Sequence, residues 1–287
     1  MLALPEENPS VFVTILAKSK ALVLPFYLET LLNWTYPKSR MHLYIRTNDN
    51  SDETQKILEK FIADHGEKYQ GITIDTRNVD SSLRDIPLHD WSPKRFKILG
   101  HLRQESLVRC QALGFDFYFV SDVDNFLIPR TLRDLVSLNL DYVGPYLLHA
   151  IDTDSFPPGI ESTAAAQYGS DLLNLHHLSD GNGFYKDSPV YQAILNQNIK
   201  GVIEGDTVHA TYLIRGSQLE KLSYIDYSSR YEYIVFSRSV HRAGVKQYFD
   251  SRLIYGCQTL SENVAACKIV LRTLEVMYTV LNPRISD

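Results

Sequence analysis

Two carboxylates one residue apart, Asp122 and Asp124, are the residues of this sequence whose types and spacing most clearly indicate chemistry. They directly follow residues 116–121 (DFYFVS), whose apolar and aromatic side chains are typical of a buried strand. Ligands collect at the carboxyl ends of strands in open α/β sheets. If no Lys or Arg pairs with them, two neighbouring acids repel each other unless a cation lies between or beside them. Oxygen ligands favour hard ions such as Mg²⁺ or Mn²⁺, which phosphates and water complete. The pair therefore indicates a divalent-cation site beside a phosphorylated ligand.

A D-x-D pair alone is a weak indicator, because most such pairs are acids in surface turns. The chain contains its own comparison in Asp152 and Asp154, which follow another apolar segment and lie in what we expect to be a solvated loop. The first pair differs from this one in two ways. A strand pattern precedes Asp122, and the apolar residues Phe126 and Leu127 follow the pair. These flanks favour a buried sheet edge for the first pair.

Three further side chains are candidates for a catalytic centre, and each also has an ordinary structural explanation. His209 lies in a strand pattern (DTVHATYLI) and is either a third metal ligand or a half-buried strand histidine. Glu232 lies at the start of a helix pattern, where the helix dipole favours an ionised carboxylate. It is either a general base or a helix-stabilising acid. Asp226 is a second candidate base.

The elements that must position these residues alternate between strand and helix in the first half of the chain. The second half is less regular, with loops expected over residues 152–185. Strands are predicted over residues 11–17, 41–46, 71–79, 116–121, 141–148, 207–214 and 247–249, and helices over 21–34, 51–65, 93–113, 131–138, 190–196, 232–243 and 261–281. Asn50 is expected to cap the second helix with Glu53 at its third position, and Ser92 with Pro93 to start the third. The pattern predicts an α/β fold with a mixed, mostly parallel sheet and helices on both faces.

Composition and missing motifs exclude several classes of protein. The 287 residues carry a net charge of −5, which argues against nucleic acid as the main partner. No apolar run approaches the ~20 residues of a transmembrane helix, and the three cysteines have neither disulfide nor zinc spacing. The sequence motifs of P-loop NTPases, dinucleotide-binding oxidoreductases, serine hydrolases and zinc proteases are missing from the sequence.

Several segments together resemble the glycosyltransferase domain of the procollagen galactosyltransferases and their relatives. The matching segments are residues 15–54, 89–107, 119–132, 183–186 (GFYK), 208–214 (VHATYLI) and 231–244. The resemblance implies a nucleotide-diphospho-sugar transferase fold of the GT-A type. It also implies the transfer of a hexose or pentose from a UDP-sugar to a hydroxyl of a glycan or protein acceptor, assisted by Mn²⁺ or Mg²⁺ and with inversion at the anomeric carbon.

Carried over residue by residue, the resemblance assigns Asp122, Asp124 and His209 as metal ligands. It makes Glu232 the candidate base and Asp226 the second candidate, although this chain has Tyr231-Glu232-Tyr233 where the relatives have two adjacent acids. The residues expected to contact the nucleotide sugar are Ala17, Thr47, Asp49, Arg103, Asp122 and Val123.

The expected organisation is one glycosyltransferase domain over residues 1–287. It has a nucleotide-binding half at about 11–127, an acceptor-side half at about 128–260 and a terminal helix at 261–281. Because no signal peptide is visible, we expect a cytoplasmic location, or the ER lumen if the natural protein carries a signal. Two alternatives stay open, a metal-dependent nucleotidyltransferase or phosphohydrolase and a non-catalytic sugar-nucleotide-binding module. The oligomeric state and the identity of the sugar are left open.

Overall fold

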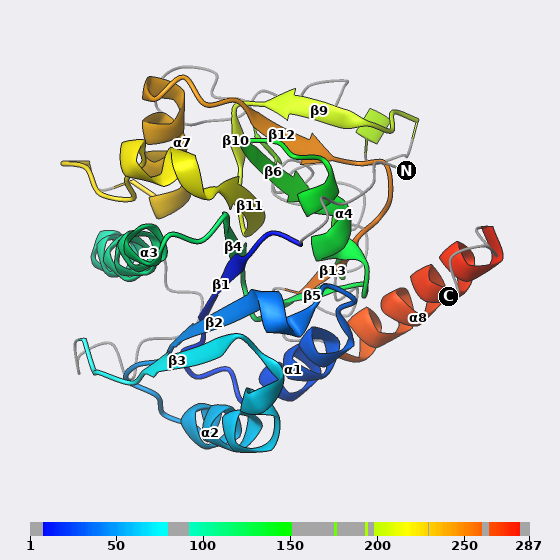
Figure 1. Cartoon of the computed structure of the whole chain (residues 1–287), viewed down its shortest axis with the longest axis horizontal. Helices are drawn as coiled ribbons and strands as arrows, with labels where there is room; N and C mark the ends of the chain where they lie inside the picture. The colour runs from blue at the N-terminus through cyan, green and yellow to red at the C-terminus, as the bar shows by residue number, and fades with distance from the viewer. Residues whose placement is uncertain are drawn as a thin grey trace, which may run out of the picture.

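An eight-stranded mixed sheet forms the centre of the structure (Figure 1), a computed structural model that describes residues 8–79, 92–150, 175–176, 193–194, 198–228, 230–259 and 264–281. The strand order is β3-β2-β1-β4-β11-β6-β12-β9. Strands β1 to β4 and the β6–β12 pair run parallel, whereas β11 is antiparallel to both of its neighbours and β9 is antiparallel to β12. The strands are β1 (Val11–Leu16), β2 (Met41–Arg46), β3 (Gly71–Asp75), β4 (Phe117–Ser121), β6 (Tyr142–Pro145), β9 (Val202–Gly205), β11 (Thr211–Arg215) and β12 (Gln247–Asp250).

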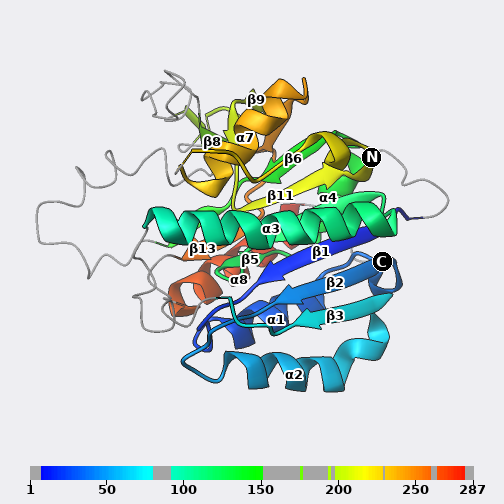
Figure 2. The same ribbon diagram turned by 90° about the vertical axis from the view of Figure 1, so that its left-hand side faces the viewer.

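Helices cover both faces of this sheet, because alternate residues of its strands point to opposite sides. In β1, Val11, Val13 and Ile15 pack in one apolar cluster with residues of α1 (Leu24–Asn33) and α2 (Thr54–His65). Phe12 packs in the other cluster with α3 (Pro93–Leu113) and α7 (Glu232–Arg242). Figure 2 looks onto the face that α3 crosses. The predicted α/β fold with a mostly parallel sheet between two helical layers is therefore confirmed.

Shorter elements complete the fold. Two small sheets combine β5 (Asn125–Leu127) with β13 (Gly256–Thr259) and β7 (Leu148–Ala150), and β10 (Thr207–Val208) with β8 (Leu175–His176). The remaining helices are α4 (Thr131–Ser137) and α8 (Val264–Leu281), with 3₁₀ turns at Lys38–Arg40, Gly66–Lys68 and Gly216–Lys221. The three cysteines are free and buried. No helix in the described part of the chain has a stretch long and apolar enough to span a bilayer.

The start and end signals of α3 act as the sequence indicates. The Ser92 side chain accepts a hydrogen bond from the backbone N–H of Arg95 at 3.4 Å, and Pro93 occupies the first turn. Gly114 ends the helix with φ +70°, a conformation that glycine adopts without strain.

The start of α2 was predicted wrongly. The helix begins at Thr54, and Asn50 is not its cap. The amide of Asn50 instead joins two loops, since its oxygen accepts from Ser19 N–H at 2.8 Å and its nitrogen donates to Thr47 Oγ1 at 2.7 Å. Asp52 accepts from Thr54 N–H at 3.0 Å. The predicted cap, Asn50, lies three residues before the observed N-cap position at Glu53, because a tertiary contact engages the amide of Asn50.

The strand predicted over residues 207–214 is also interrupted. It divides into β10 and β11 because Ala210 has φ +65°, which breaks the extended backbone immediately after His209. Strand β3 ends at Asp75 rather than at residue 79. Outside the described residues lie the loops expected over residues 152–185 except 175–176, the GFYK segment (183–186), most of the predicted helix 190–196 and residues 261–263 of the predicted terminal helix.

Candidate functional site

The loop after β4 and the end of β1 meet at one edge of the sheet. Strands β1 and β4 are parallel neighbours, so their carboxyl ends adjoin there. A cavity of about 170 Å³ lies at this edge, and Ala17, Asp122, Val123 and Asp124 contribute to its wall. The predicted acids therefore lie where ligands bind in open α/β folds.

Helix α3 supplies another wall of the cavity. The residues it contributes repeat at the spacing of one helical face, at positions i, i+3, i+4, i+7 and i+8. They are Arg95, Ile98, Leu99, Leu102 and Arg103. Of these, only Arg103 was singled out from the sequence, although the spacing alone identifies the whole face once the helix is placed.

Basic side chains dominate the polar lining of the cavity. They come from the loop after β1, from the end of β2 and from α3. Asp122 and Asp124 are the two carboxylates of the wall, and its basic members are Lys18, Lys20, Arg46, Arg95 and Arg103. The surplus of positive charge suits an anionic ligand such as a diphosphate.

Each of the two acids is ion-paired to a basic side chain of the cavity. Arg103 Nη2 donates to Asp122 Oδ1 at 2.8 Å, and Lys20 Nζ donates to Asp124 Oδ2 at 3.3 Å. The side chains of Asp122 and Asp124 keep 28% and 24% of their surface exposed. The acids are thus neutralised by the protein, yet they stay on the wall of a cavity.

Arg103 connects the acid pair to Glu232. Its side chain is only 6% exposed, and its Nε lies 3.8 Å from Glu232 Oε1. The buried Nη1 of Arg103 has no hydrogen-bond partner among the residues that the structure describes. Because an unpaired buried donor is costly and the residue lines the cavity, this N–H group is suited to an anion that enters there.

Burial sets the electrostatics of the two acids that share Arg103. It raises the pKa of Glu232, and the charge of Arg103 opposes this rise. Burial also raises the pKa of Asp122, where Arg103 lowers it and the neighbouring charge of Asp124 raises it further. A carboxylate with a raised pKa beside a cavity has the property expected of a general base.

A glycine of α3 allows the chain at Tyr224 and Glu232 to pack closely against this helix. A Cβ at Gly100 would lie 2.9 Å from the carbonyl oxygen of Tyr224 and 3.7 Å from Glu232 Cβ. Glycine in the middle of a helix is unfavourable by itself, so the close approach of the chain at Tyr224 and α7 accounts for this position.

His209 lies between β10 and β11, and its ring stacks on Tyr233 with centroids 4.4 Å apart. Burial, assisted by the charge of Arg103, lowers the pKa of His209 to about 3, so the imidazole is neutral at pH 7 and able to bind a metal. Among the described residues, no three His, Cys, Asp or Glu side chains are gathered to hold a metal ion. Asp122 and Asp124 fit an ion that one or two carboxylates and substrate phosphates hold, while the role of His209 stays a prediction.

Thr47 and Asp49 are buried in the loop that follows β2. Thr47 N–H donates to the carbonyl of Asp75 at 3.0 Å, and Asp49 Oδ2 accepts from Val79 N–H at 2.9 Å. Their neighbour Asn48, rather than either of them, contributes to the cavity wall. Their side chains shape the loop, and their predicted nucleotide contacts stay untested.

Asp226 does not join the group around Arg103. Its Oδ1 accepts hydrogen bonds from the N–H and the hydroxyl of Ser228, at 2.7 and 2.6 Å, which makes it the centre of a local turn. Glu232 is therefore the acid that the structure brings next to the cavity residues.

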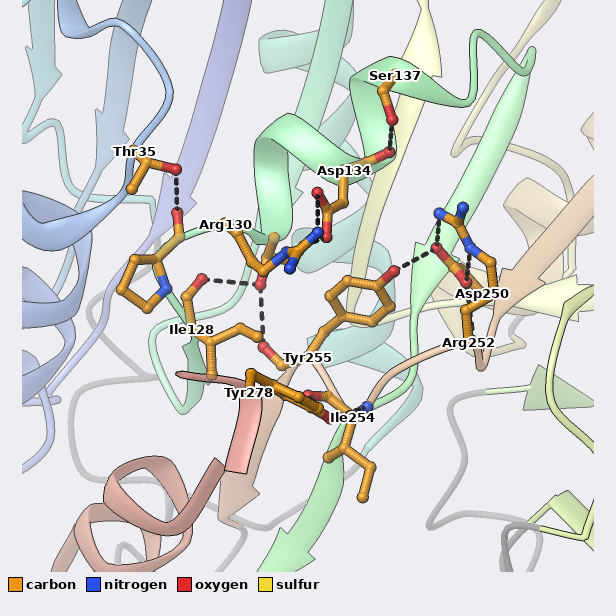
Figure 3. A network of polar contacts seen from close by, with 12 residues as sticks. Thr35, Ile128, Arg130, Asp134, Ser137, Asp250, Arg252, Ile254, Tyr255 and Tyr278 are labelled. Atoms are coloured by element: carbon orange, nitrogen blue, oxygen red, sulfur yellow. Dashed lines mark hydrogen bonds and ion pairs between the residues drawn. The ribbon is translucent and has the colours of Figure 1, made fainter. Parts of the chain in front are cut away.

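The small sheet holds the backbone of the acid loop from behind. Strand β13 pairs with β5, directly after the acids, and Thr259 N–H donates to the carbonyl of Asp124 at 3.0 Å. Tyr255, the residue before β13, anchors the start of this strand (Figure 3). Its hydroxyl donates to Asp250 Oδ2 at 2.8 Å, and its carbonyl accepts a hydrogen bond from Ile128 N–H at 2.9 Å. These contacts fix the segment that carries Asp124, and the three-residue strands behind them were not predicted from the sequence.

Comparison with known proteins relates this chain to a family of glycosyltransferases. A family model described as glycosyltransferase family 25, N-terminal domain, matches residues 8–266. Procollagen galactosyltransferase 2 of Mus musculus is 31% identical over 278 residues, which cover 91% of this chain and 41% of that protein. A human relative named inactive glycosyltransferase 25 family member 3 is 27% identical over 258 residues, 86% of this chain and 40% of that one.

The chain thus spans about two fifths of the length of these relatives. Among solved structures, residues 1–349 of S. aureus TarS in complex with UDP-GlcNAc superpose with a TM-score of 0.54 at 13% identity, over 87% of this chain and 58% of that one. At this identity the likeness concerns the fold alone, which is of the GT-A type, as predicted.

Proposed function

This chain belongs to glycosyltransferase family 25, and we propose that it transfers a sugar from a UDP-sugar to a hydroxyl of a glycan or protein acceptor. The proposed reaction depends on Mn²⁺ or Mg²⁺ and inverts the anomeric carbon. The observation that carries this proposal is the cavity at the ends of β1 and β4, where two carboxylates and a surplus of basic side chains share one wall. Residues 11–127 would form the nucleotide-binding half and residues 128–260 the acceptor side of a single domain.

The donor diphosphate would lie against the basic wall. Arg103 supports this placement most directly, because its buried Nη1 lacks a partner in the described part of the chain. Ala17 and Val123 line the same cavity and would contact the nucleoside part, with Thr47 and Asp49 shaping the neighbouring loop. Anion recognition of this kind draws on charge-assisted hydrogen bonds, which are stronger than neutral ones.

Asp122 and Asp124 would hold the metal ion, with the neutral imidazole of His209 as the candidate third ligand. When bound, the ion would supply positive charge against the negative charge that develops on the departing UDP. In this arrangement Arg103 keeps its hydrogen bond to Oδ1 of Asp122, and the other carboxylate oxygen would face the ion. The guanidinium would thus hold the carboxylate in place.

Glu232 would act as the general base. An inverting transfer needs one group that accepts the proton of the attacking hydroxyl. The proton would pass to a carboxylate oxygen of Glu232, and the nearby guanidinium of Arg103 keeps that carboxylate ionised before the reaction.

A donor assay tests the proposal. The chain is incubated with UDP-Gal, UDP-Glc and UDP-Xyl, in Mn²⁺ and then in EDTA, and released UDP is measured, with the anomeric configuration of any product determined by NMR. We expect release of UDP from one donor in Mn²⁺ and its loss in EDTA. Release of pyrophosphate or inorganic phosphate would instead indicate a nucleotidyltransferase or phosphohydrolase. Tight binding of a UDP-sugar without turnover would favour a non-catalytic module. One human relative of this chain is itself named inactive.

The acid loop is tested by Asp124→Asn. We expect metal-dependent UDP binding, measured by calorimetry, to be lost while the melting temperature stays close to that of the wild type, because the side chain is partly exposed. Asp141→Asn is the matched control, since Asp141 also pairs with a basic residue, Arg215 at 3.0 Å, and lies outside the cavity wall. Unchanged metal-dependent UDP affinity in Asp124→Asn would mean that the ion binds elsewhere.

The base is tested by Glu232→Gln against Asp226→Asn. We expect Glu232→Gln to lower kcat by a factor of about 10² or more while UDP affinity is retained, and Asp226→Asn to keep most of the activity. Because burial raises the pKa of Glu232, activity should fall as the pH drops through a value above the ordinary glutamate pKa of 4.5. Full activity of Glu232→Gln would reject its role as the base.

A further inference from the structure

Lys20 is held at a fixed place in the loop between β1 and α1. Its backbone N–H donates to Thr54 Oγ1 at 2.6 Å, and its carbonyl accepts from Leu24 N–H at 2.9 Å. The preceding residue, Ser19, has φ +49° and donates its N–H to the Asn50 amide oxygen at 2.8 Å. The backbone of Lys20 is therefore anchored from two sides, which fixes where its side chain starts beside the acid loop.

The two basic partners of the acid pair are held with different strength. Arg103 lies 2.8 Å from Asp122, is 6% exposed and carries a rigid, planar guanidinium. Lys20 lies 3.3 Å from Asp124, is 15% exposed and carries a point charge on a flexible arm. The Lys20 contact is longer than the ~2.7–2.9 Å typical of charge-assisted hydrogen bonds. Lys20 is therefore the partner that exchanges more easily.

The charge of Lys20 reaches both acids. Its ammonium pairs with Asp124, and the same charge contributes to lowering the pKa of Asp122, against the larger effect of burial. A divalent ion that binds these two carboxylates would meet this positive charge at short range. Like charges repel, so the ammonium must move away for the ion to bind tightly.

Lys20 also lines the cavity, so a second anionic partner is within its reach once a diphosphate enters. We infer that Lys20 is an exchangeable counter-ion that couples the binding of the metal to the binding of the donor diphosphate. Without nucleotide it neutralises Asp124 and weakens metal binding. With nucleotide its ammonium moves to a phosphate oxygen, and Asp124 becomes free for the ion. This inference rests on the proposed function and names a positioning residue of the same site.

The coupling has a measurable form. If Lys20 links the two ligands, UDP raises the affinity for Mn²⁺ and Mn²⁺ raises the affinity for UDP by the same factor. Lys20→Met removes the ammonium and keeps the length of the side chain. We expect this variant to bind Mn²⁺ without nucleotide about twofold to fivefold more tightly than the wild type, as for the loss of one partly exposed opposing charge. The factor by which UDP raises Mn²⁺ affinity should fall correspondingly.

The experiment follows free Mn²⁺ by its electron paramagnetic resonance spectrum while the full chain is titrated, with and without UDP. Lys20→Arg, which keeps the charge, should retain most of the coupling. Lys246→Met is the matched control. It breaks another lysine–carboxylate pair, because Lys246 Nζ lies 2.8 Å from Glu204 Oε2. This pair joins β9 to the start of β12, which are the last two strands of the sheet and are remote from β1. This control should bind Mn²⁺ like the wild type.

The outcomes separate this inference from the proposed function. Mn²⁺ affinity that is unchanged or weaker in Lys20→Met without UDP would overturn the role of Lys20, and so would UDP binding that does not depend on Mn²⁺ in the wild type. The second result would leave donor binding itself intact. A wild type that binds no UDP under any condition would overturn the proposed function as well.

Discussion

Replacing Arg103 by methionine tests the electrostatic centre of the site. The change keeps a long apolar side chain but removes the one cation that Asp122 and Glu232 share. Removing one partner of a buried ion pair costs about 3–5 kcal/mol, because the remaining charge stays buried without compensation. Asp122 is 28% exposed and can regain water, whereas Glu232 is 11% exposed. We therefore expect the lower end, about 3 kcal/mol, which for a chain of this size is a fall in Tm of about 6 °C.

The pH dependence of this loss has a defined sign. Burial raises the pKa of Asp122 and of Glu232 in the folded chain even with Arg103 present. An acid whose folded pKa is raised destabilises the fold as the pH rises above its unfolded pKa, and this effect vanishes below that pKa. Without Arg103 both values rise further. The Tm difference between Arg103→Met and the wild type should therefore be large at pH 7 and should narrow toward pH 5.

Thermal unfolding followed by circular dichroism between pH 5 and pH 8 measures this difference. Arg133→Met is the control, because Arg133 is exposed and donates to the Thr35 carbonyl at the surface. It should change Tm by no more than ordinary surface substitutions do. A Tm of Arg103→Met within 1–2 °C of the wild type at pH 7, or a difference that widens on acidification, would refute the account of a shared buried cation.

Two further substitutions test the packing that positions the site. Gly100→Ala places a methyl 2.9 Å from the carbonyl oxygen of Tyr224 and should lower the free energy of unfolding, measured by chemical denaturation, by about 1–3 kcal/mol. Gly201→Ala is the control, because its methyl meets nothing within 4 Å and should change this free energy by less than about 0.5 kcal/mol. Equal effects would show that α3 has room at this point. Tyr255→Phe removes the hydroxyl that donates, beside Arg252, to the fully buried Asp250 and should cost about 1.5–3 kcal/mol by the same measurement. A neutral effect would mean that this contact does not anchor the start of β13.

The part of the fold that the sequence predicts is the part that local patterns determine. The face of α3 toward the cavity follows from its 3.6-residue period, and its ends follow from Ser92 and Gly114. The acid loop follows from a buried strand that stops at Ser121. Each of these signals acts within a few residues, so one sequence contains all the information needed.

The remainder depends on partners that are distant in the chain. Strand β11 pairs antiparallel between β4 and β6, a placement that no local pattern specifies. The amide of Asn50 resembles a helix cap, but its oxygen accepts from Ser19, 31 residues away. Lys20 lies 104 residues before Asp124 and has no feature in the sequence that connects the two. Ion pairs of this kind arise from chain topology, so they appear only in the folded structure.

The neighbouring acids predict a cation beside them, and the charges around them can be compared with the divalent ion that we propose. Arg103 and Lys20 already supply two positive charges within the site. With Asp122, Asp124 and Glu232 all ionised, the group keeps one negative charge, since three carboxylates face two basic side chains. A divalent ion reverses the charge of this group and adds to the attraction that the basic wall already has for a diphosphate, whose arrival gives Lys20 a new partner. Metal and nucleotide therefore each favour the binding of the other, which is a consequence of charge balance at this site.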